Sequence, residues 1–253
     1  MAKRKKKKRS IWWALITILF LITAGLLYIM NRYQPSSIRY TAFGIDLPSG
    51  YSIHGIDISK YQQLIDWPAV KAMKVKDKKI GFVFIKATEG QGMVDARFRQ
   101  NWFRAEQAGI TKGAYHFFRP SFSGKAQAEN FIETVKLKSG DLPPVLDVEV
   151  INDAPVEQFR QRLKDWLVTV EQAVGVQPII YSNADFYTRY LSGNFEEYPF
   201  WVAHYFAKGK PRVQRNWIFW QHSERGKVDG IKPSVDFNVF YGDSTDFVDL
   251  LIP

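Results

Sequence analysis

The 253-residue chain contains no cysteine and only four histidines. The absence of cysteine excludes a disulfide scaffold, a cysteine-ligated zinc site and a lipid attached through a cysteine. His54, His116, His204 and His222 form no HxH or HExxH spacing, so we expect neither a metal nor a cofactor. No GxGxxG or GxxxxGKS motif follows a β-rich run, so nucleotide binding has no support.

Outside the first ten residues, positive and negative charges are nearly balanced. The formal net charge is +10, but seven of the 35 Lys and Arg lie between Lys3 and Arg9, and without them 28 cations face 25 acidic residues. A nucleic-acid-binding surface would carry its basic residues on the folded part, interleaved with aromatics. We therefore expect no nucleic-acid partner. The 46% hydrophobic and 15% aromatic content predicts a globular chain.

No charged residue occurs from Ile11 to Met30. As a helix rising about 1.5 Å per residue, this segment spans about 30 Å, the thickness of a bilayer core. Basic residues precede it and only Arg32 and Arg39 follow soon after, which predicts a signal anchor at 11–30, with 1–10 as a cytoplasmic tail and the remaining chain outside the cell membrane. A cleaved signal peptide is the alternative, although its apolar region is normally about 7 to 15 residues long.

Residues 31–52 mix Pro, Gly and Ser, and we expect them to form a linker with at most one edge strand. In residues 53–253, five β-rich runs alternate with helical patterns: 53–59, 81–88, 112–118, 143–150 and 177–183. Three more runs follow at intervals too short for full crossover helices: 199–205, 216–223 and 234–242. This order predicts an α/β fold, an irregular TIM-like (β/α)₅β₃ barrel, with an open doubly wound sheet as the alternative.

Acidic residues close several of these strands. In a parallel barrel the active site lies at the carboxyl ends of the strands, where Asp57, Asp147, Glu149 and Asp236 fall. Asp147 and Glu149 face the same side of one strand, about 7 Å apart along it. An idle pair in an apolar strand would cost several kcal/mol of desolvation, which favours acid–base function over a structural role. Closure of the barrel would make Asp57 and Asp236 neighbours in one acidic cup.

Five aromatic residues leave two interpretations open. They are either ordinary core residues or the walls of a carbohydrate cleft, where rings stack on sugar faces. These residues are Tyr115, Tyr181, Trp201, Trp217 and Trp220.

Eight motifs between His54 and Phe240 resemble, in order, those of the glycoside hydrolase family 25 lysozymes (Chalaropsis-type muramidases). They are HGIDISKYQ, FVFIKATEG, GAYHFFRP, PVLDVE, IIYSN, FWVAHY, FWQHS and VDFNVF. The resemblance implies an irregular (β/α)₅β₃ barrel. It also implies cleavage of the β-1,4 bond between N-acetylmuramic acid and N-acetylglucosamine, with peptidoglycan glycan strands as the partner.

The resemblance also implies roles for individual residues. Glu149 corresponds to the general acid and base, and Asp147 to the carboxylate that orients the 2-acetamido group in a substrate-assisted, retaining reaction. Six further residues correspond to substrate-binding positions of the cleft: Asp57, Asp236, Tyr115, Tyr181, Trp201 and Gln221.

Two other functions remain open beside an anchored muramidase for local wall remodelling. One is a catalytically inactive, membrane-anchored peptidoglycan-binding protein, which the presence of all four acidic residues disfavours. The other is a chitinase or related acetamido-sugar hydrolase. We expect no obligate protein partner.

Overall fold

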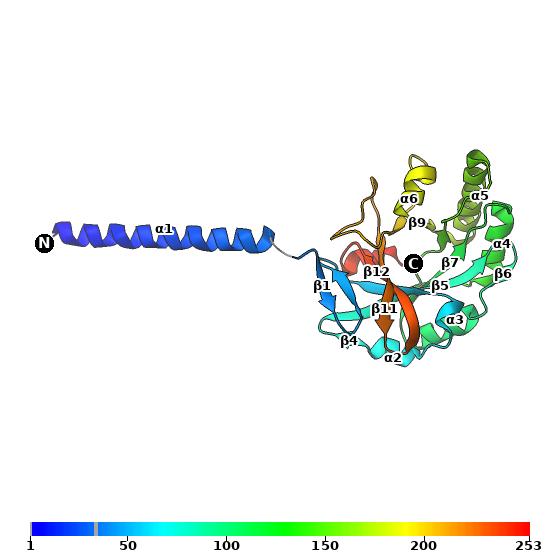
Figure 1. The fold of residues 1–253 in the computed structure, drawn as a ribbon, viewed down its shortest axis with the longest axis horizontal. Coiled ribbons are helices and arrows are strands. Elements are labelled where there is room, and N and C mark those ends of the chain that lie inside the picture. The colour runs from blue at the N-terminus through cyan, green and yellow to red at the C-terminus, as the bar shows by residue number, and fades with distance from the viewer. Residues whose placement is uncertain (1, 33–34) are drawn as a thin grey trace. The chain divides into compact units, whose positions relative to one another are not determined.

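The computed structural model describes residues 2–32 and 35–253, which divide into two units, Met1–Ser36 and Ser37–Pro253. The first unit holds α1 (Ala2–Arg32) (Figure 1). Its segment Ile11–Ile29 has a mean hydropathy of 2.1, is unburied, and is long and apolar enough to cross a membrane. The hydroxyls of Thr17 and Thr23 donate to carbonyls one turn earlier, at 2.9 and 2.8 Å, so neither is left unsatisfied. The side chains of the predicted basic tail, 1–10, lie outside the described part.

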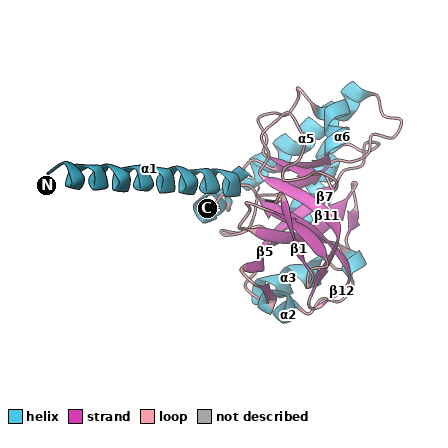
Figure 2. Cartoon of the chain, turned by 60° about the vertical axis from the view of Figure 1, so that its left-hand side comes forward, coloured by secondary structure: helices cyan, strands magenta, loops and turns pink. Residues whose placement is uncertain are grey.

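The second unit is built around a closed barrel of eight strands, which confirms the predicted barrel over the open sheet (Figure 2). β3 closes it by pairing in parallel with β5 on one side and antiparallel with β12 on the other. The strands are β3 (His54–Ile58), β5 (Lys78–Glu89), β7 (Thr111–Phe117), β8 (Val145–Asp147), β9 (Ile179–Asn183), β10 (Phe200–Ala203), β11 (Phe219–Val228) and β12 (Ile231–Phe240).

Helices follow the early strands, while β11 and β12 form a long antiparallel hairpin. One of the helical patterns between the strands forms α5, whose apolar stripe buries Phe159, Leu163, Trp166, Leu167 and Val170. The helix is capped at its end by Gly175, with φ 81°. The helices and short elements are η1 (Lys60–Gln62), α2 (Trp67–Ala72), β4 (Lys74–Val75), β6 (Met93–Val94), α3 (Phe98–Gln107), α4 (Gly124–Thr134), α5 (Val156–Val174), α6 (Ala184–Phe186), η2 (Tyr187–Leu191) and α7 (Ser244–Leu250).

Aromatic side chains fill the inside of the barrel. The Phe84 ring stacks on Trp201 at 4.6 Å between centroids and meets Phe219 edge-on at 5.2 Å. The neighbouring Phe82 ring fits because residue 55 is glycine, where a Cβ would lie 2.5 Å from that ring. The interior is therefore a packed core that supports whatever lies at the strand ends.

The linker expected at 31–52 is wrong from Ser37 onward, because a hairpin packs there against the barrel. β1 (Ser37–Tyr40) and β2 (Ile45–Pro48) pair antiparallel and bury Tyr40, Phe43, Ile45 and Leu47. The Phe43 carbonyl accepts from the Lys227 N–H at 2.9 Å, and its ring lies 5.2 Å from that of Phe237. The domain therefore begins at Ser37 rather than at residue 53, because the apolar residues among Pro, Gly and Ser anchor this hairpin.

We expect Phe43→Ala to lower the free energy of unfolding of the domain by about 3 to 5 kcal/mol, as for other buried phenylalanines. Ile38→Ala, on the same hairpin but 43% exposed, is the matched control and should change it far less. Urea unfolding followed by tryptophan fluorescence measures both. Equal stability of Phe43→Ala and wild type would show that 37–52 is a linker after all.

Candidate active site

A cleft of about 290 Å³ lies at the carboxyl ends of the barrel strands and gathers all eight predicted site residues. These are Asp57, Asp147, Glu149, Asp236, Tyr115, Tyr181, Trp201 and Gln221. Six residues of the lining were not predicted: Ser59, Tyr61, Lys86, Phe117, Tyr205 and Glu224. Tyr205 follows the end of β10, so the rule that selected the carboxylates would also have found it.

Asp57 is the most completely hydrogen-bonded carboxylate of the cleft. Its Oδ2 accepts from Gln221 Nε2 at 2.8 Å and from Asn238 Nδ2 at 2.7 Å. Trp201 Nε1 donates to Asn238 Oδ1 at 2.8 Å and so fixes the orientation of that amide. Burial raises the pKa of Asp57 to about 6, while hydrogen bonds from Asn238, Gln221 and Asp236 oppose the rise.

Asp236 lies directly opposite Asp57 in the β12–β3 pair, so the predicted proximity of the two carboxyl groups is confirmed. Burial and the charge of Asp57 raise the pKa of Asp236 to about 9, and the two side chains share a hydrogen bond. At neutral pH Asp236 is therefore the protonated donor and Asp57 the acceptor, and the pair carries about one negative charge.

Asp147 and Glu149 form the second acidic pair. Asp147 ends β8, and Glu149 lies two residues beyond it in the following segment. Burial raises the pKa of both: the charge of Glu149 adds to the rise at Asp147, and the charge of Asp57 to the rise at Glu149. Asp147 Oδ1 is buried and has no hydrogen-bond partner among the described residues. The pair can thus supply a proton from one member and an unsatisfied acceptor from the other.

Two tyrosines connect the acidic pairs. Tyr181 donates to Gln221 Oε1 at 2.9 Å and lies 3.5 Å from Glu149 Oε1, while Tyr205 donates to the same amide oxygen at 2.7 Å. With its oxygen held by two hydroxyls, the Gln221 amide presents its NH₂ group to Asp57. The network fixes side-chain positions over the width of the cleft.

Lys86 brings a positive charge into the cleft wall. Its Nζ donates to Glu89 Oε2 at 2.7 Å, and Arg119 Nε donates to Glu89 Oε1 at 2.8 Å. The Phe117 ring lies 4.8 Å from each of the two cationic groups. Lys86 opposes the rise in pKa at both Asp147 and Glu149. The sequence feature that could have identified Lys86 as a cleft residue is a lysine within the apolar run FVFIKATEG, although it does not lie at the strand end.

The histidines do not line this cleft. Burial lowers the pKa of His54 and of His116 to about 4 and that of His222 to about 3, so all three are neutral near pH 7. His116 lies between Thr88 Oγ1 (2.7 Å) and Gln127 Oε1 (3.2 Å), which gives it a structural role. Among residues 2–32 and 35–253, no group of three His, Asp or Glu side chains is arranged to hold a metal ion.

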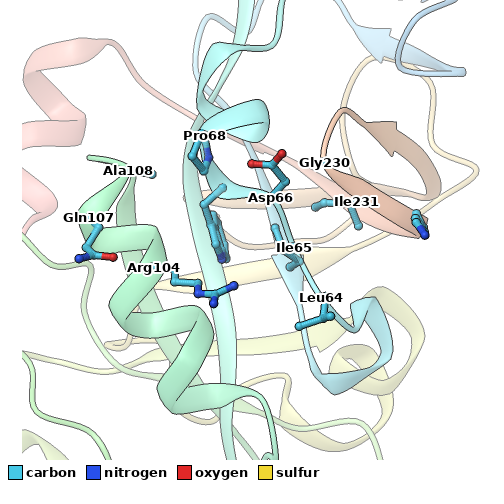
Figure 3. Close-up of a pocket in the computed structure, with 11 residues that line it drawn as sticks. Leu64, Ile65, Asp66, Pro68, Arg104, Gln107, Ala108, Gly230 and Ile231 are labelled. Atoms are coloured by element: carbon cyan, nitrogen blue, oxygen red, sulfur yellow. The ribbon is translucent and has the colours of Figure 1, made fainter.

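A larger hollow of about 780 Å³ lies on the outside of the barrel, between α2, the end of α3 and the turn joining β11 to β12 (Figure 3). Leu64, Ile65 and Ile231 contribute apolar side chains to it. Its one carboxylate, Asp66, caps α2 by accepting from the Ala69 N–H at 3.3 Å. Because this hollow has no second acidic side chain, it offers no acid–base pair. The smaller acidic cleft is therefore the candidate active site, although the hollow has the larger volume.

Comparison with known proteins places the chain among carbohydrate-cleaving enzymes. A family model described as "Glycosyl hydrolases family 25" matches residues 56–231. The chain is 48% identical to protein YegX of Escherichia coli (strain K12) over 201 residues, 79% of this chain and 74% of that protein. It is 36% identical to Lysozyme M1 of Streptomyces globisporus over 205 residues, 75% of this chain and 68% of that protein. A family 25 glycosyl hydrolase structure from Bacillus anthracis aligns with a TM-score of 0.73 at 33% identity, covering 80% and 95% of the two chains.

We expect the contribution of Asp236 to stability to fall between about pH 4 and pH 9, because the folded chain keeps a proton on Asp236 that the unfolded chain releases near its ordinary pKa of 3.8. Asp236→Asn has no proton to release. Its unfolding free energy should therefore fall less steeply, by up to about 1.4 kcal/mol per pH unit.

Urea unfolding at a series of pH values measures this difference, with the exposed Asp249→Asn as the control. Parallel pH profiles for wild type and Asp236→Asn would contradict a retained proton in the Asp57–Asp236 pair.

Proposed function

Because the chain belongs to glycosyl hydrolases family 25, we propose that its acidic cleft hydrolyses the β-1,4 bond between N-acetylmuramic acid and N-acetylglucosamine in peptidoglycan. The enzyme is a glycosidase of the lysozyme type, like the Streptomyces globisporus relative. The observation that supports the proposal most strongly is the pair formed by the buried Asp147, at the end of β8, and the half-buried Glu149 just beyond it. Such a pair can divide the roles of proton donor and anion.

Glu149 acts as the general acid in this proposal. Its pKa is raised by burial and by the charge of Asp57, so it holds a proton at a higher pH than an ordinary glutamate. It protonates the glycosidic oxygen as the bond from the anomeric carbon to that oxygen breaks. It then takes a proton from the water that attacks the same carbon.

Asp147 acts on the 2-acetamido group of the muramic acid. The acetamido N–H is a donor that would satisfy the unpartnered Oδ1. With the N–H held, the acetamido oxygen attacks the anomeric carbon and displaces the leaving sugar, and the nearby carboxylate stabilises the positive charge on the resulting ring. Two displacements at one carbon retain its configuration.

The remaining predicted residues bind and orient the sugar. Asp57 and Asp236 hold a charge of about −1 beside Glu149, and Tyr115 and Tyr181 face the acetamido region. Trp201 and Gln221 complete the cleft wall through the Asn238 and Asp57 hydrogen bonds. A catalytically inactive wall-binding protein fits the site less well, because a binding cleft has no need of two carboxyl groups with raised pKa values.

α1 serves as an uncleaved signal anchor in this proposal, with the N-terminus in the cytoplasm and the domain facing the wall. The length and hydropathy of Ile11–Ile29 support a membrane span, and the preceding basic residues support this orientation. A tethered muramidase reaches only the wall near its own membrane, which suits local remodelling or turnover.

We expect Glu149→Gln to reduce hydrolysis of purified peptidoglycan at least about a hundredfold, because it removes the proton donor and keeps the shape. New reducing ends, identified as muramic acid by mass spectrometry, measure the activity, and chitin is the comparison substrate. Glu157→Gln, an exposed glutamate on α5, is the control and should remain active. Binding of peptidoglycan without cleavage by wild type would establish a wall-binding protein instead.

We expect peptidoglycan with N-deacetylated muramic acid to resist the wild-type enzyme, since an amine has no carbonyl oxygen for the internal attack. The Asp147→Asn variant should lose activity on acetylated substrate and gain none on the deacetylated one. Proton NMR of the first-formed product should show the β-anomer. An α-anomer as the initial product would rule out the two-step route.

A further inference from the structure

A cluster of lysines occupies the end of the barrel opposite the cleft. Residues 71–79 contain five lysines and one aspartate, whereas the whole domain, 37–253, has 27 Lys and Arg against 25 Asp and Glu. Without this nine-residue segment the domain has a net negative charge. The segment runs from the end of α2 through β4 to the first residues of β5, at the amino end of that strand.

Three of these lysines, Lys74, Lys76 and Lys79, are exposed and make no ion pair among the described residues. Lys78 is less exposed; it pairs with Asp77 at 3.0 Å and donates to the Tyr51 carbonyl at 3.0 Å. Lys71 is exposed as well, but its Nζ donates to the Gly109 carbonyl. The positive charge of the segment that no described protein oxygen accepts is therefore on Lys74, Lys76 and Lys79, which we call the lysine cluster.

Lys74 and Lys79 are direct partners across the antiparallel β4–β5 pair. Like charges opposite each other in such a pair repel, and this arrangement costs stability unless an anion lies between them. Lys76 lies at the tip of the same turn. The three ammonium groups thus lie on one small hairpin. This arrangement is better suited to binding a surface that carries several negative charges than to simple hydration of each lysine.

The lysine cluster adjoins the place where the chain enters the domain. Lys76 Nζ lies 5.3 Å from the centre of the Tyr40 ring, and the Tyr40 hydroxyl donates to Asp77 at 3.4 Å. Tyr40 ends the strand that begins at Ser37, the first residue of the domain. Six residues, 31–36, separate Ser37 from the end of the predicted span at Met30, and six residues extend to at most about 21 Å.

A groove of about 660 Å³ connects the lysine cluster to the hairpin. Lys74 and Lys76 line it together with Ala42 of the β1–β2 turn and the apolar Met73 and Val75. Asp229 contributes one carboxylate to the same groove. Cations above a partly apolar groove match the phosphate and the adjoining glycerol and acyl region of a phospholipid.

We propose that the lysine cluster binds the headgroups of anionic phospholipids, so that the amino end of the barrel docks on the membrane surface. This inference rests on the proposed anchor, because the short tether keeps Ser37 near the bilayer. Anionic lipids attract basic clusters within about one Debye length of the surface, about 8 Å at physiological salt. A wall polymer has no comparable reason to meet the face on which the tether ends.

The test uses the full chain in lipid nanodiscs with a fluorophore on Ala42→Cys, which is labelled uniquely because the sequence has no other cysteine. Nitroxide-headgroup lipids quench the dye when the groove lies at the headgroups. We expect quenching at least about twofold stronger in discs with about 30% phosphatidylglycerol than in pure phosphatidylcholine, and loss of the difference in about 0.5 M salt.

Two charge-matched triple variants identify the surface. The variant K74Q/K76Q/K79Q should abolish the effect of anionic lipid on quenching. The control K125Q/K136Q/K164Q should retain this effect; it changes exposed lysines on α4, just after α4 and on α5, respectively. Equal quenching in both lipid compositions, or equal loss in both triple variants, would overturn docking while the anchor stands.

Separate readouts distinguish the remaining outcomes. Chain that fails to co-elute with the discs overturns the anchor and, with it, the docking. If K74Q/K76Q/K79Q leaves quenching unchanged but weakens binding to peptidoglycan, the lysine cluster contacts the wall polymer and docking is overturned. Loss of hydrolysis in Glu149→Gln bears on the muramidase proposal alone.

Discussion

The antiparallel pairing of β12 with β3 is the constraint on which the site depends. This pairing closes the barrel, and its register sets the half-buried Asp236 opposite the buried Asp57, so the two carboxyl groups share a proton. The shared proton limits the charge of the pair to about −1 at neutral pH. That charge in turn raises the pKa of Glu149, so strand closure and acid strength are linked by one backbone register.

Much of this arrangement could be predicted because its signals are local. Apolar runs marked the eight strands, and acidic residues at the ends of the parallel strands marked the cleft, since such strands bring their carboxyl ends to one face. Asp236 instead lies midway along the antiparallel β12 and reaches the cleft through its register with Asp57. Lys86 escaped because it lies within β5, where alternation alone does not show that a charged side chain reaches a cleft. The hairpin at 37–48 escaped because its burial depends on contacts with β11 and β12, residues remote in sequence.

The five aromatic residues could belong either to the barrel core or to the wall of the cleft, and the structure shows which role each one has. Trp201 has both: its ring stacks in the barrel core, and it lines the cleft while orienting Asn238. Tyr115 and Tyr181 also reach the cleft. Trp217 and Trp220 instead pack around Tyr51, each at 6.0 Å between ring centres. The sequence alone could not distinguish core residues from cleft residues, because both roles require large apolar side chains on strands.

β5 connects the two charged ends of the domain. It begins at Lys78, beside the lysine cluster, and reaches Lys86 in the cleft eight residues later, a rise of about 26 Å for an extended strand. A rigid strand of this length fixes the spacing between the cluster and the acidic residues. A domain docked through its amino end would therefore hold its cleft at a nearly constant height above the lipid and open toward the wall. Tethering and barrel geometry together would then select which glycan strands are cut, namely those that lie at this height.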